Sequence, residues 1–195
     1  MSATRRFSHA IAEGDGISVV AAVEDSDAAR AAEAQRAEAL VVNSDPARLR
    51  EATRLPILWR ANVAVDRAAD VADAVTLTLP DEDEDHDPAQ RRHEDALAAG
   101  LDCAVEVLSE EELERALEVL DPEIFLLTPQ QDDEEERLEL VLELLAAVPA
   151  GKLAIADLAV TTEREVHELE RAGVDAVIVH AADVSPLVGE APPEV

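Results

Sequence analysis

The stretch LAIADLAVTTEREVHELERAGVDAVIVH (residues 153–180) contains two apolar runs on either side of a segment with helical periodicity. Thr162 and Glu165 have the spacing of a helix-capping box, and Gly173 predicts the end of the helix. Two buried strands joined by an amphipathic helix form a βαβ unit, whose strands run parallel with a right-handed crossover. This unit decides the fold because the rest of the chain repeats it.

Eight apolar runs, each followed by a turn or a helical segment, predict eight strands. Runs without strict alternation are typical of parallel strands that are buried on both faces. Eight βα repeats close a (β/α)₈ TIM barrel, and a chain of 195 residues predicts a minimal one. Prolines after His180 predict a truncated eighth helix. An open doubly wound sheet is the alternative that periodicity leaves open. The predicted strands are residues 17–24, 39–43, 55–63, 74–80, 101–108, 123–129, 153–160 and 174–180.

The chain divides into one predicted domain and two short flanks. Residues 1–16, which end in GDG, predict a loose N-terminal lead-in, and residues 17–184 predict a single barrel domain. Residues 185–195 form a proline-rich C-terminal tail. We find no apolar run long enough to span a membrane and no signal-peptide core, so we expect a cytoplasmic protein without a membrane partner.

The charge of the chain is strongly negative and evenly spread. Asp and Glu total 45 against 16 Lys and Arg, which gives a net charge of −29, and Lys152 is the only lysine. Self-repulsion of this size is screened at molar salt, where the Debye length is about 3 Å. The composition resembles that of proteins from halophilic archaea; an acidic surface for a basic partner is the alternative. Nucleic-acid binding requires a basic footprint, so we do not expect it.

Functional residues of βα barrels lie where strands end and in the loops that follow. Glu106 is the most informative candidate because it interrupts the apolar run CAVEV, where a carboxylate is costly unless it is functional or paired, for example with Arg60 across the barrel mouth. Loop capping is the alternative role for Asp157, and a satisfied polar contact is the alternative for His180. The predicted catalytic residues are Arg60, Glu106, Asp157 and His180, and the predicted substrate-binding residues are Glu24, Asn62, Thr128 and Asp183.

Several motifs that would indicate a cofactor or a metal are missing from the sequence. The six glycines form neither a phosphate-binding loop nor a dinucleotide fingerprint, and no zinc-ligand spacing or nucleophile elbow occurs. We therefore predict no cofactor and no metal. The acidic loop DEDEDHD (residues 81–87) is either a solvated run of charges or a weak cation site. The single cysteine, Cys103, is expected to be a buried structural thiol.

Three segments resemble one enzyme family of the ribulose-phosphate-binding barrels. LDCAVEVLSEEELERAL (residues 101–117) resembles the fifth strand and helix of indole-3-glycerol-phosphate synthase, the barrel lyase of tryptophan synthesis. AIADLAVTTEREVHELERAGVDAVIV (residues 154–179) resembles its seventh strand, the following helix and its eighth strand. LPILWRANVAVD (residues 55–66) resembles its third strand, usually written LPVLRKDFIID.

The resemblance implies a partly retained site. These enzymes close an indole ring and release carbon dioxide, with a lysine general acid, carboxylates and a phosphate site on the last two strands. Glu106 matches the glutamate of the fifth strand, Asp157 stands in place of the seventh strand's glutamate, and Arg60 replaces the lysine of the third. The other family positions, for the carboxylate and lysine of strand one, the asparagine of strand six and the phosphate site, fall on Ala22, Glu24, Thr128, Leu158, Ala159, His180 and Ala181.

These substitutions favour a divergent barrel that has lost the parent reaction. The leading hypothesis is a non-catalytic protein that binds an anionic small molecule or a partner, with self-association along the seam left by the truncated helix. The alternatives are a diverged lyase or isomerase, with Glu106 as base and Arg60 as anion holder, and retained indole-3-glycerol-phosphate synthase activity.

Overall fold

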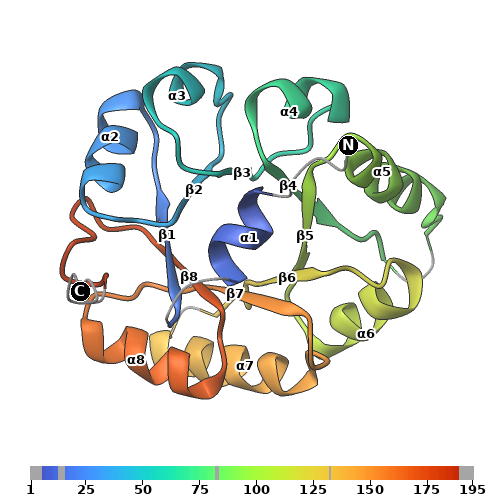
Figure 1. Cartoon of the computed structure of the whole chain (residues 1–195). Helices are drawn as coiled ribbons and strands as arrows, with labels where there is room; N and C mark the ends of the chain where they lie inside the picture. Colours follow the sequence, from blue (N-terminus) through green and yellow to red (C-terminus); the bar gives the residue numbers. More distant parts are fainter. Residues whose placement is uncertain (1–5, 13–15, 82–83, 132, 189–195) are drawn as a thin grey trace.

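Eight parallel strands form a closed barrel in the computed structural model, which describes residues 6–12, 16–81, 84–131 and 133–188 (Figure 1). The strands are paired in chain order from β1 to β8, and β8 pairs with β1. This closure confirms the predicted (β/α)₈ barrel and excludes the doubly wound sheet. The strands are β1 (Ser18–Ala22), β2 (Ala39–Val42), β3 (Ile57–Trp59), β4 (Ala74–Thr78), β5 (Asp102–Val107), β6 (Ile124–Leu127), β7 (Leu153–Asp157) and β8 (Ala176–Val179).

Helices α2 to α8 surround the barrel and connect its strands, as a parallel sheet requires, and α1 precedes β1. None of the described helices is long and apolar enough to cross a membrane. The helices are α1 (Arg6–Ala12), α2 (Ser26–Ala34), α3 (Ala47–Ala52), α4 (Val65–Val71), α5 (Asp87–Ala98), α6 (Glu110–Val119), α7 (Glu134–Ala147) and α8 (Glu163–Ala172).

The signals for the start and end of α8 act as the sequence predicts. The Thr162 hydroxyl accepts a hydrogen bond from the Glu165 amide, and the Glu165 carboxylate accepts one from the Thr162 amide. Gly173 ends the helix with a φ of 101°, a left-handed conformation that costs glycine little. Ser109 and Glu112 have the same spacing at the start of α6, but they form only half of a capping box. The Ser109 hydroxyl accepts from the Glu112 amide, whereas the Glu112 carboxylate accepts from the Leu108 amide.

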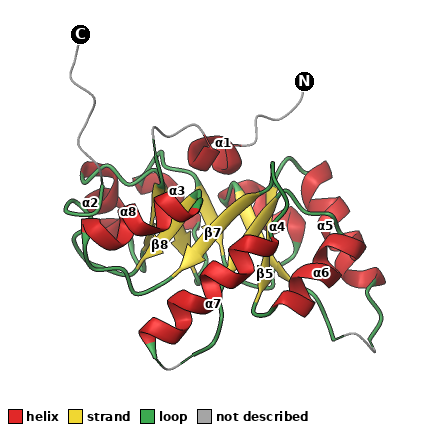
Figure 2. Cartoon of the chain, turned by 90° about the horizontal axis from the view of Figure 1, so that it is seen from below, coloured by secondary structure: helices red, strands yellow, loops and turns green. Residues whose placement is uncertain are grey.

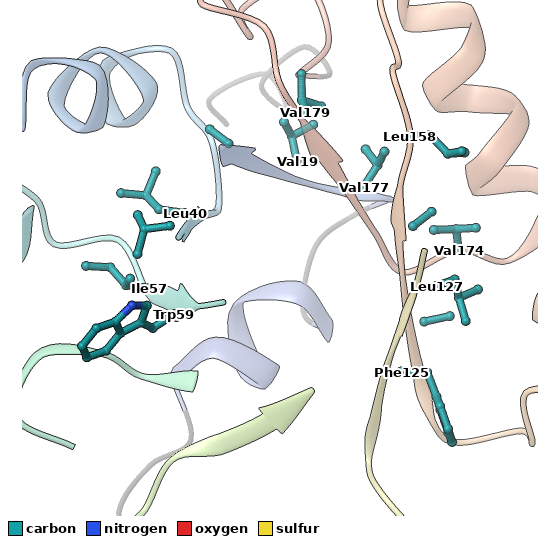
Figure 3. Packing of buried hydrophobic residues seen from close by; sticks show 14 of the residues in the cluster. Val19, Leu40, Ile57, Trp59, Phe125, Leu127, Leu158, Val174, Val177 and Val179 are labelled. Carbon is teal, nitrogen blue, oxygen red and sulfur yellow. The ribbon is translucent and has the colours of Figure 1, made fainter. Parts of the chain in front are cut away.

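Successive side chains of each strand point to opposite faces of the sheet, so the core has an outer and an inner part. Outward-facing side chains pack against the helices, and Figure 3 shows Trp59 and Phe125 on the side of the strands away from α1. Inward-facing side chains fill the barrel, so its centre is packed and carries no pore. The buried inner side chains on the strands are Val20, Ala39, Val41, Leu58, Ala74, Ala104, Ile124, Leu126, Ile155, Ala176 and Ile178.

The predicted loose lead-in is wrong for residues 6–12, which form α1; residues 1–5 and 13–15 lie outside the described residues. Phe7 and Ile11 are buried with the inner core, and α1 lies across the amino-terminal end of the barrel (Figure 2). Ser8 donates from its amide and its hydroxyl to the two oxygens of Asp102. The inner alanines leave space at this end, which the apolar face of α1 fills.

Among the described residues after β8, which end at residue 188, residues 185–187 form a turn and no helix. Val184 and Leu187 are buried against the outer core, and the Val184 amide donates to the Gln35 side chain at the end of α2. Val184 and Leu187 thus pack where the seam was predicted, and self-association along it stays a prediction. Residues 189–195 of the predicted tail lie outside the described residues.

The placement of the acids predicts a stability that depends on salt. Asp102 is the only buried carboxylate among the described residues, so the repulsion within a net charge of −29 acts mainly across the surface, where ions screen it. We expect the melting temperature to rise steadily from dilute buffer to molar KCl. Glycerol at equal osmolality serves as an uncharged control, and a melting temperature that ignores or falls with KCl would contradict the prediction.

Candidate functional site

The barrel interior becomes polar at the carboxyl ends of its strands, among them β3, β5, β6, β7 and β8. On each of these five strands the polar residue follows an inner apolar residue by two positions, so that alternation directs both side chains into the barrel. Functional groups of βα barrels occupy this end. The five pairs are Leu58 and Arg60, Ala104 and Glu106, Leu126 and Thr128, Ile155 and Asp157, and Ile178 and His180.

Arg60 connects two carboxylates across the barrel mouth. Its Nη2 donates to Glu106 Oε1, and its Nη1 donates to Asp157 Oδ2 at 2.6 Å. The predicted ion pair between Arg60 and Glu106 is thus present, and Asp157 joins it. All three side chains are at most 25% exposed, so solvent screens these pairs less than surface pairs.

Two further side chains extend this network. Thr128 Oγ1 donates to Glu106 Oε1 at 3.0 Å. His180 Nε2 lies 2.7 Å from Asp157 Oδ1. The structure therefore brings all four predicted catalytic residues and Thr128 into one hydrogen-bonded chain, in which Arg60 holds the centre and His180 the most exposed end.

The network shifts the pKa values of Arg60, Asp157 and His180 in the direction that favours their charged forms. The hydrogen bond to Asp157 raises the pKa of His180, although burial and the Arg60 charge oppose it. Burial alone would raise the pKa of Asp157, but hydrogen bonds and charges from His180 and Arg60 lower it overall. Burial likewise opposes the charge on Arg60, yet the two carboxylates raise its pKa. An arginine held in this way stays protonated.

Two cavities open at the mouth on either side of Arg60 and Glu106, which line both. The first cavity has a volume of 770 Å³ and lies over β3 to β5 and α5. The second cavity has a volume of 650 Å³ and lies over β6 to β8. The first is lined by Asn43, Arg60, Ala61, Asn62, Thr76, Leu77, Thr78, Leu79, Pro80, Asp85, Pro88, Ala89, Arg92 and Glu106. The second is lined by Arg60, Glu106, Thr128, Pro129, Gln130, Gln131, Arg137, Asp157, Leu158, Ala159 and His180.

Of the other predicted substrate-binding residues, Asn62 lies at a cavity, whereas Glu24 and Asp183 do not. Asn62 lines the first cavity. Glu24 lines neither, because β1 ends at Ala22 and the chain turns into the cap of α2. Asp183 also lies outside both cavities, where it accepts hydrogen bonds from the amide and hydroxyl of Ser185 in a local turn.

Two arginines that the sequence analysis missed line the cavities. Arg92 reaches the first cavity from α5, and Arg137 reaches the second from α7. Both lie in helical segments among many exposed charged residues, and neither follows a strand. Their spacing carries no signal of a site, so only the packing of the helices on the barrel places them there.

No group of three or more His, Cys, Asp or Glu side chains is arranged to hold a metal ion in the part of the chain that the structure describes. Residues 82–83 of the acidic loop, the alternative cation site of the sequence, lie outside that part. Cys103 is buried, as predicted, and burial raises the pKa of its thiol to about 12. Such a thiol is an inert core group.

Comparison with known proteins gives a partial match to one enzyme family. No family model matches the chain. The indole-3-glycerol phosphate synthase of Polaromonas naphthalenivorans (strain CJ2) is 38% identical over 98 residues, which are 49% of this chain and 37% of that protein. The enzyme of the same name from Geobacillus sp. (strain WCH70) is 28% identical over 141 residues, 67% of this chain and 52% of that protein. The matched part thus spans from about a third to about half of these relatives' length.

A solved structure described as "Native KDPGal structure" has the same architecture. It matches with a TM-score of 0.64 and covers 87% of this chain and 91% of its own chain, at 12% sequence identity. At that identity the likeness shows the fold alone. The chain is therefore a (β/α)₈ barrel that is similar to indole-3-glycerol phosphate synthases over about half of its length.

The contact between His180 and Asp157 predicts a measurable titration. We expect the imidazole in the folded protein to titrate above its ordinary value of about 6.5. Asp157→Asn should lower that midpoint, because it replaces a charged acceptor with a neutral amide and leaves the Arg60 charge. Since the folded-state pKa is raised, the contact stabilises the fold fully below pH 6.5, and this stabilisation is lost as pH rises through the folded value. Proton NMR of the His180 ring measures the midpoint.

Asp183→Asn is the matched control for this titration. It removes the same charge three residues from His180 but leaves the contact with Asp157 in place. A His180 midpoint at or below its ordinary value in the unmodified chain, or equal shifts in the two variants, would show that the contact does not control the imidazole.

Proposed function

We propose that this chain is a divergent relative of the indole-3-glycerol phosphate synthases that binds an anionic small molecule at the barrel mouth and does not carry out the ring-closing decarboxylation. The observation that carries the proposal is the engagement of Arg60 with both Glu106 and Asp157. The resemblance implies that an indole-3-glycerol phosphate synthase has a lysine proton donor on the third strand and separate carboxylates on the fifth and seventh strands. Here one guanidinium occupies the donor's position and neutralises both acids.

The identity of residue 60 bears most directly on the chemistry. A general acid must release its proton near the working pH, and efficiency is greatest when its pKa lies close to that pH. Lysine reaches this range when burial lowers its pKa, whereas arginine does not. The two carboxylates raise the pKa of Arg60 further, so its role in the proposal is to hold charge and position.

The loop after β7 supports the loss of the family's phosphate site. Leu158 is buried where the resemblance places a serine, and Ala159 stands where it places a glycine. The amides of Thr161 and Thr162 both donate to the Glu165 carboxylate, at 2.8 and 3.0 Å. Backbone donors that would bind a phosphate at the start of α8 already have an anionic partner within the protein.

Binding of an anion elsewhere at the mouth remains favourable. Arg137 lines the second cavity and donates to the neutral carbonyl oxygen of Gln131, so its charge is not cancelled by that contact. His180, whose raised pKa favours the cationic form, lines the same cavity. In a chain of net charge −29 these cations provide a local site for a small anion.

The composition supports a second element of the proposal, operation in molar salt as in halophilic archaea. Exposed acids, one lysine and few aromatic residues all agree with it. If the folded protein were as stable in dilute buffer as in molar KCl, this element of the proposal would be wrong.

The loss of the parent reaction is tested by complementation of a tryptophan auxotroph in a halophilic host that lacks its own indole-3-glycerol phosphate synthase. We expect no growth without tryptophan, and no indole-3-glycerol phosphate from the purified protein in molar KCl, because Arg60 does not replace a lysine acid. The host's own gene on the same plasmid is the positive control, and immunoblotting verifies expression. Growth dependent on this chain would overturn the proposal.

Acid–base catalysis is the second candidate function, and the pairing of His180 with Asp157 favours it. An imidazole held by a carboxylate at 2.7 Å is oriented for proton transfer, and its side chain is 54% exposed at the mouth. Glu106, on the other side of Arg60, would be the second proton-transfer group. Such a pair suits a lyase or isomerase acting on a sugar phosphate, the substrate class that the resemblance indicates.

This candidate is tested with Glu106→Gln and ribulose 5-phosphate as the probe in D₂O. Catalysis through Glu106 predicts exchange of carbon-bound protons by the unmodified chain and at least a roughly 100-fold slower exchange in the variant. Thermal stability should change little because Asp157 still pairs with Arg60. Glu118→Gln, on the exposed side of α6, removes the same charge and should exchange normally. Absence of exchange in all three proteins would reject catalysis on this substrate and leave the binding proposal in place.

A further inference from the structure

The first cavity contains an arginine, Arg92, that pairs with no carboxylate among the residues that the structure describes. Arg92 Nη1 donates to the side-chain oxygen of Asn62, and Nη2 donates to the carbonyl oxygen of Ala61 at 3.4 Å. The Nε atom is buried without an acceptor. Among the described residues no acid lies within ion-pair distance of this guanidinium.

Most neighbouring cations in this chain behave differently. Arg91, adjacent on the same helix, pairs with Asp87, and Arg67 pairs with Asp45. At the mouth, Arg60 pairs with two acids, whereas Arg92, like Arg137 at the second cavity, donates to neutral oxygens. Neutral acceptors fix the orientation of the guanidinium but leave its full charge for a ligand.

The surroundings of Arg92 suit one end of a small molecule. Asn43 and Asn62 are exposed at the wall of the cavity and offer amide donors, because the Asn62 oxygen already faces Arg92. Two acids line the cavity. Glu106 is neutralised by Arg60, and Asp85 is exposed and accepts a hydrogen bond from the Asp87 amide.

Part of the lining of the first cavity is apolar. Side chains there can cover the body of a ligand while its charged group reaches Arg92, an arrangement typical of small-molecule sites. The cavity volume of 770 Å³ exceeds what a lone inorganic ion requires. The apolar lining residues are Ala61, Leu77, Leu79, Pro80, Pro88 and Ala89.

We infer that Arg92 and Asn62 form a subsite for the terminal oxyanion, a carboxylate or a phosphate monoester, of a small molecule whose apolar body lies along β4 and α5. The inference rests on the proposed function, because both place an anion at the barrel mouth. It adds a position on the side of the mouth opposite to β7 and β8. A bidentate contact from arginine to an oxyanion explains why this side chain is oriented but not neutralised.

The test is a titration of ¹⁵N-labelled protein with inorganic phosphate and, separately, with benzoate, with the ionic strength held constant by KCl. We expect the Asn62 side-chain amide and the backbone amides of Ala61 and Asn62 to shift. A stronger response to benzoate identifies a carboxylate on an apolar body as the ligand group, and a stronger response to phosphate identifies a phosphate monoester.

Arg92→Gln should weaken binding of the responding probe about 10-fold, the factor that corresponds to one charge-assisted hydrogen bond. Arg91→Gln is the matched control, since it removes the same charge one residue away without lining the cavity, and should change binding less than about 2-fold. Asn62→Ala, an exposed position, should also weaken binding and guards against a folding defect in the Arg92 variant.

The outcomes separate this inference from the proposed function. Shifts confined to residues of the second cavity, or equal losses in the Arg91 and Arg92 variants, would overturn the inference and leave anion binding at the mouth intact. If neither probe shifts residues of either cavity, both the inference and anion binding of these groups fail.

Discussion

Alternation along eight closed parallel strands is the constraint on which the rest of the molecule depends. Every second side chain must enter a barrel too narrow to hold solvent, so each inner position has to be filled, paired or covered. Apolar residues fill the middle, and α1 covers the amino-terminal end with Phe7 and Ile11. At the carboxyl end the inner positions are polar, and Arg60 provides the charge that makes two inner carboxylates tolerable.

The arginine at residue 60 therefore contributes to the stability of the barrel mouth and is central to the proposed function. Two partly buried carboxylates close to one another would repel and would favour protonation of one of them. The guanidinium removes that repulsion with two directed hydrogen bonds, and it orients Asp157 toward His180. These ion pairs place neutralised charges at the centre of the barrel mouth. The cationic side chains of Arg92, Arg137 and His180 line the cavities around that centre. A lysine there would give one mobile point charge, and its proton would be more readily lost.

The partial match to indole-3-glycerol phosphate synthases agrees with this division of the molecule. Barrel geometry and the inner carboxylates are features that a relative can keep while its chemistry changes, because they also satisfy packing. Loop features after β7 and β8 have no such structural reason to persist. In this chain the backbone donors at the start of α8 bind Glu165, and His180 contacts Asp157. A chain can therefore share the barrel fold of these enzymes and still differ from them in the residues at the barrel mouth.

The sequence by itself determined the eight strands, the helix caps at Thr162 and Gly173, and the candidates Arg60, Glu106, Asp157 and His180, because periodicity, capping and strand ends are local properties of a chain. It did not determine that residues 6–12 cover the barrel, that Glu24 and Asp183 lie outside the cavities, or that Arg92 and Arg137 line them. Those facts depend on how helices pack on a closed sheet and on where the chain turns after each strand. Only the tertiary structure decides which charges that are distant in sequence face the same space.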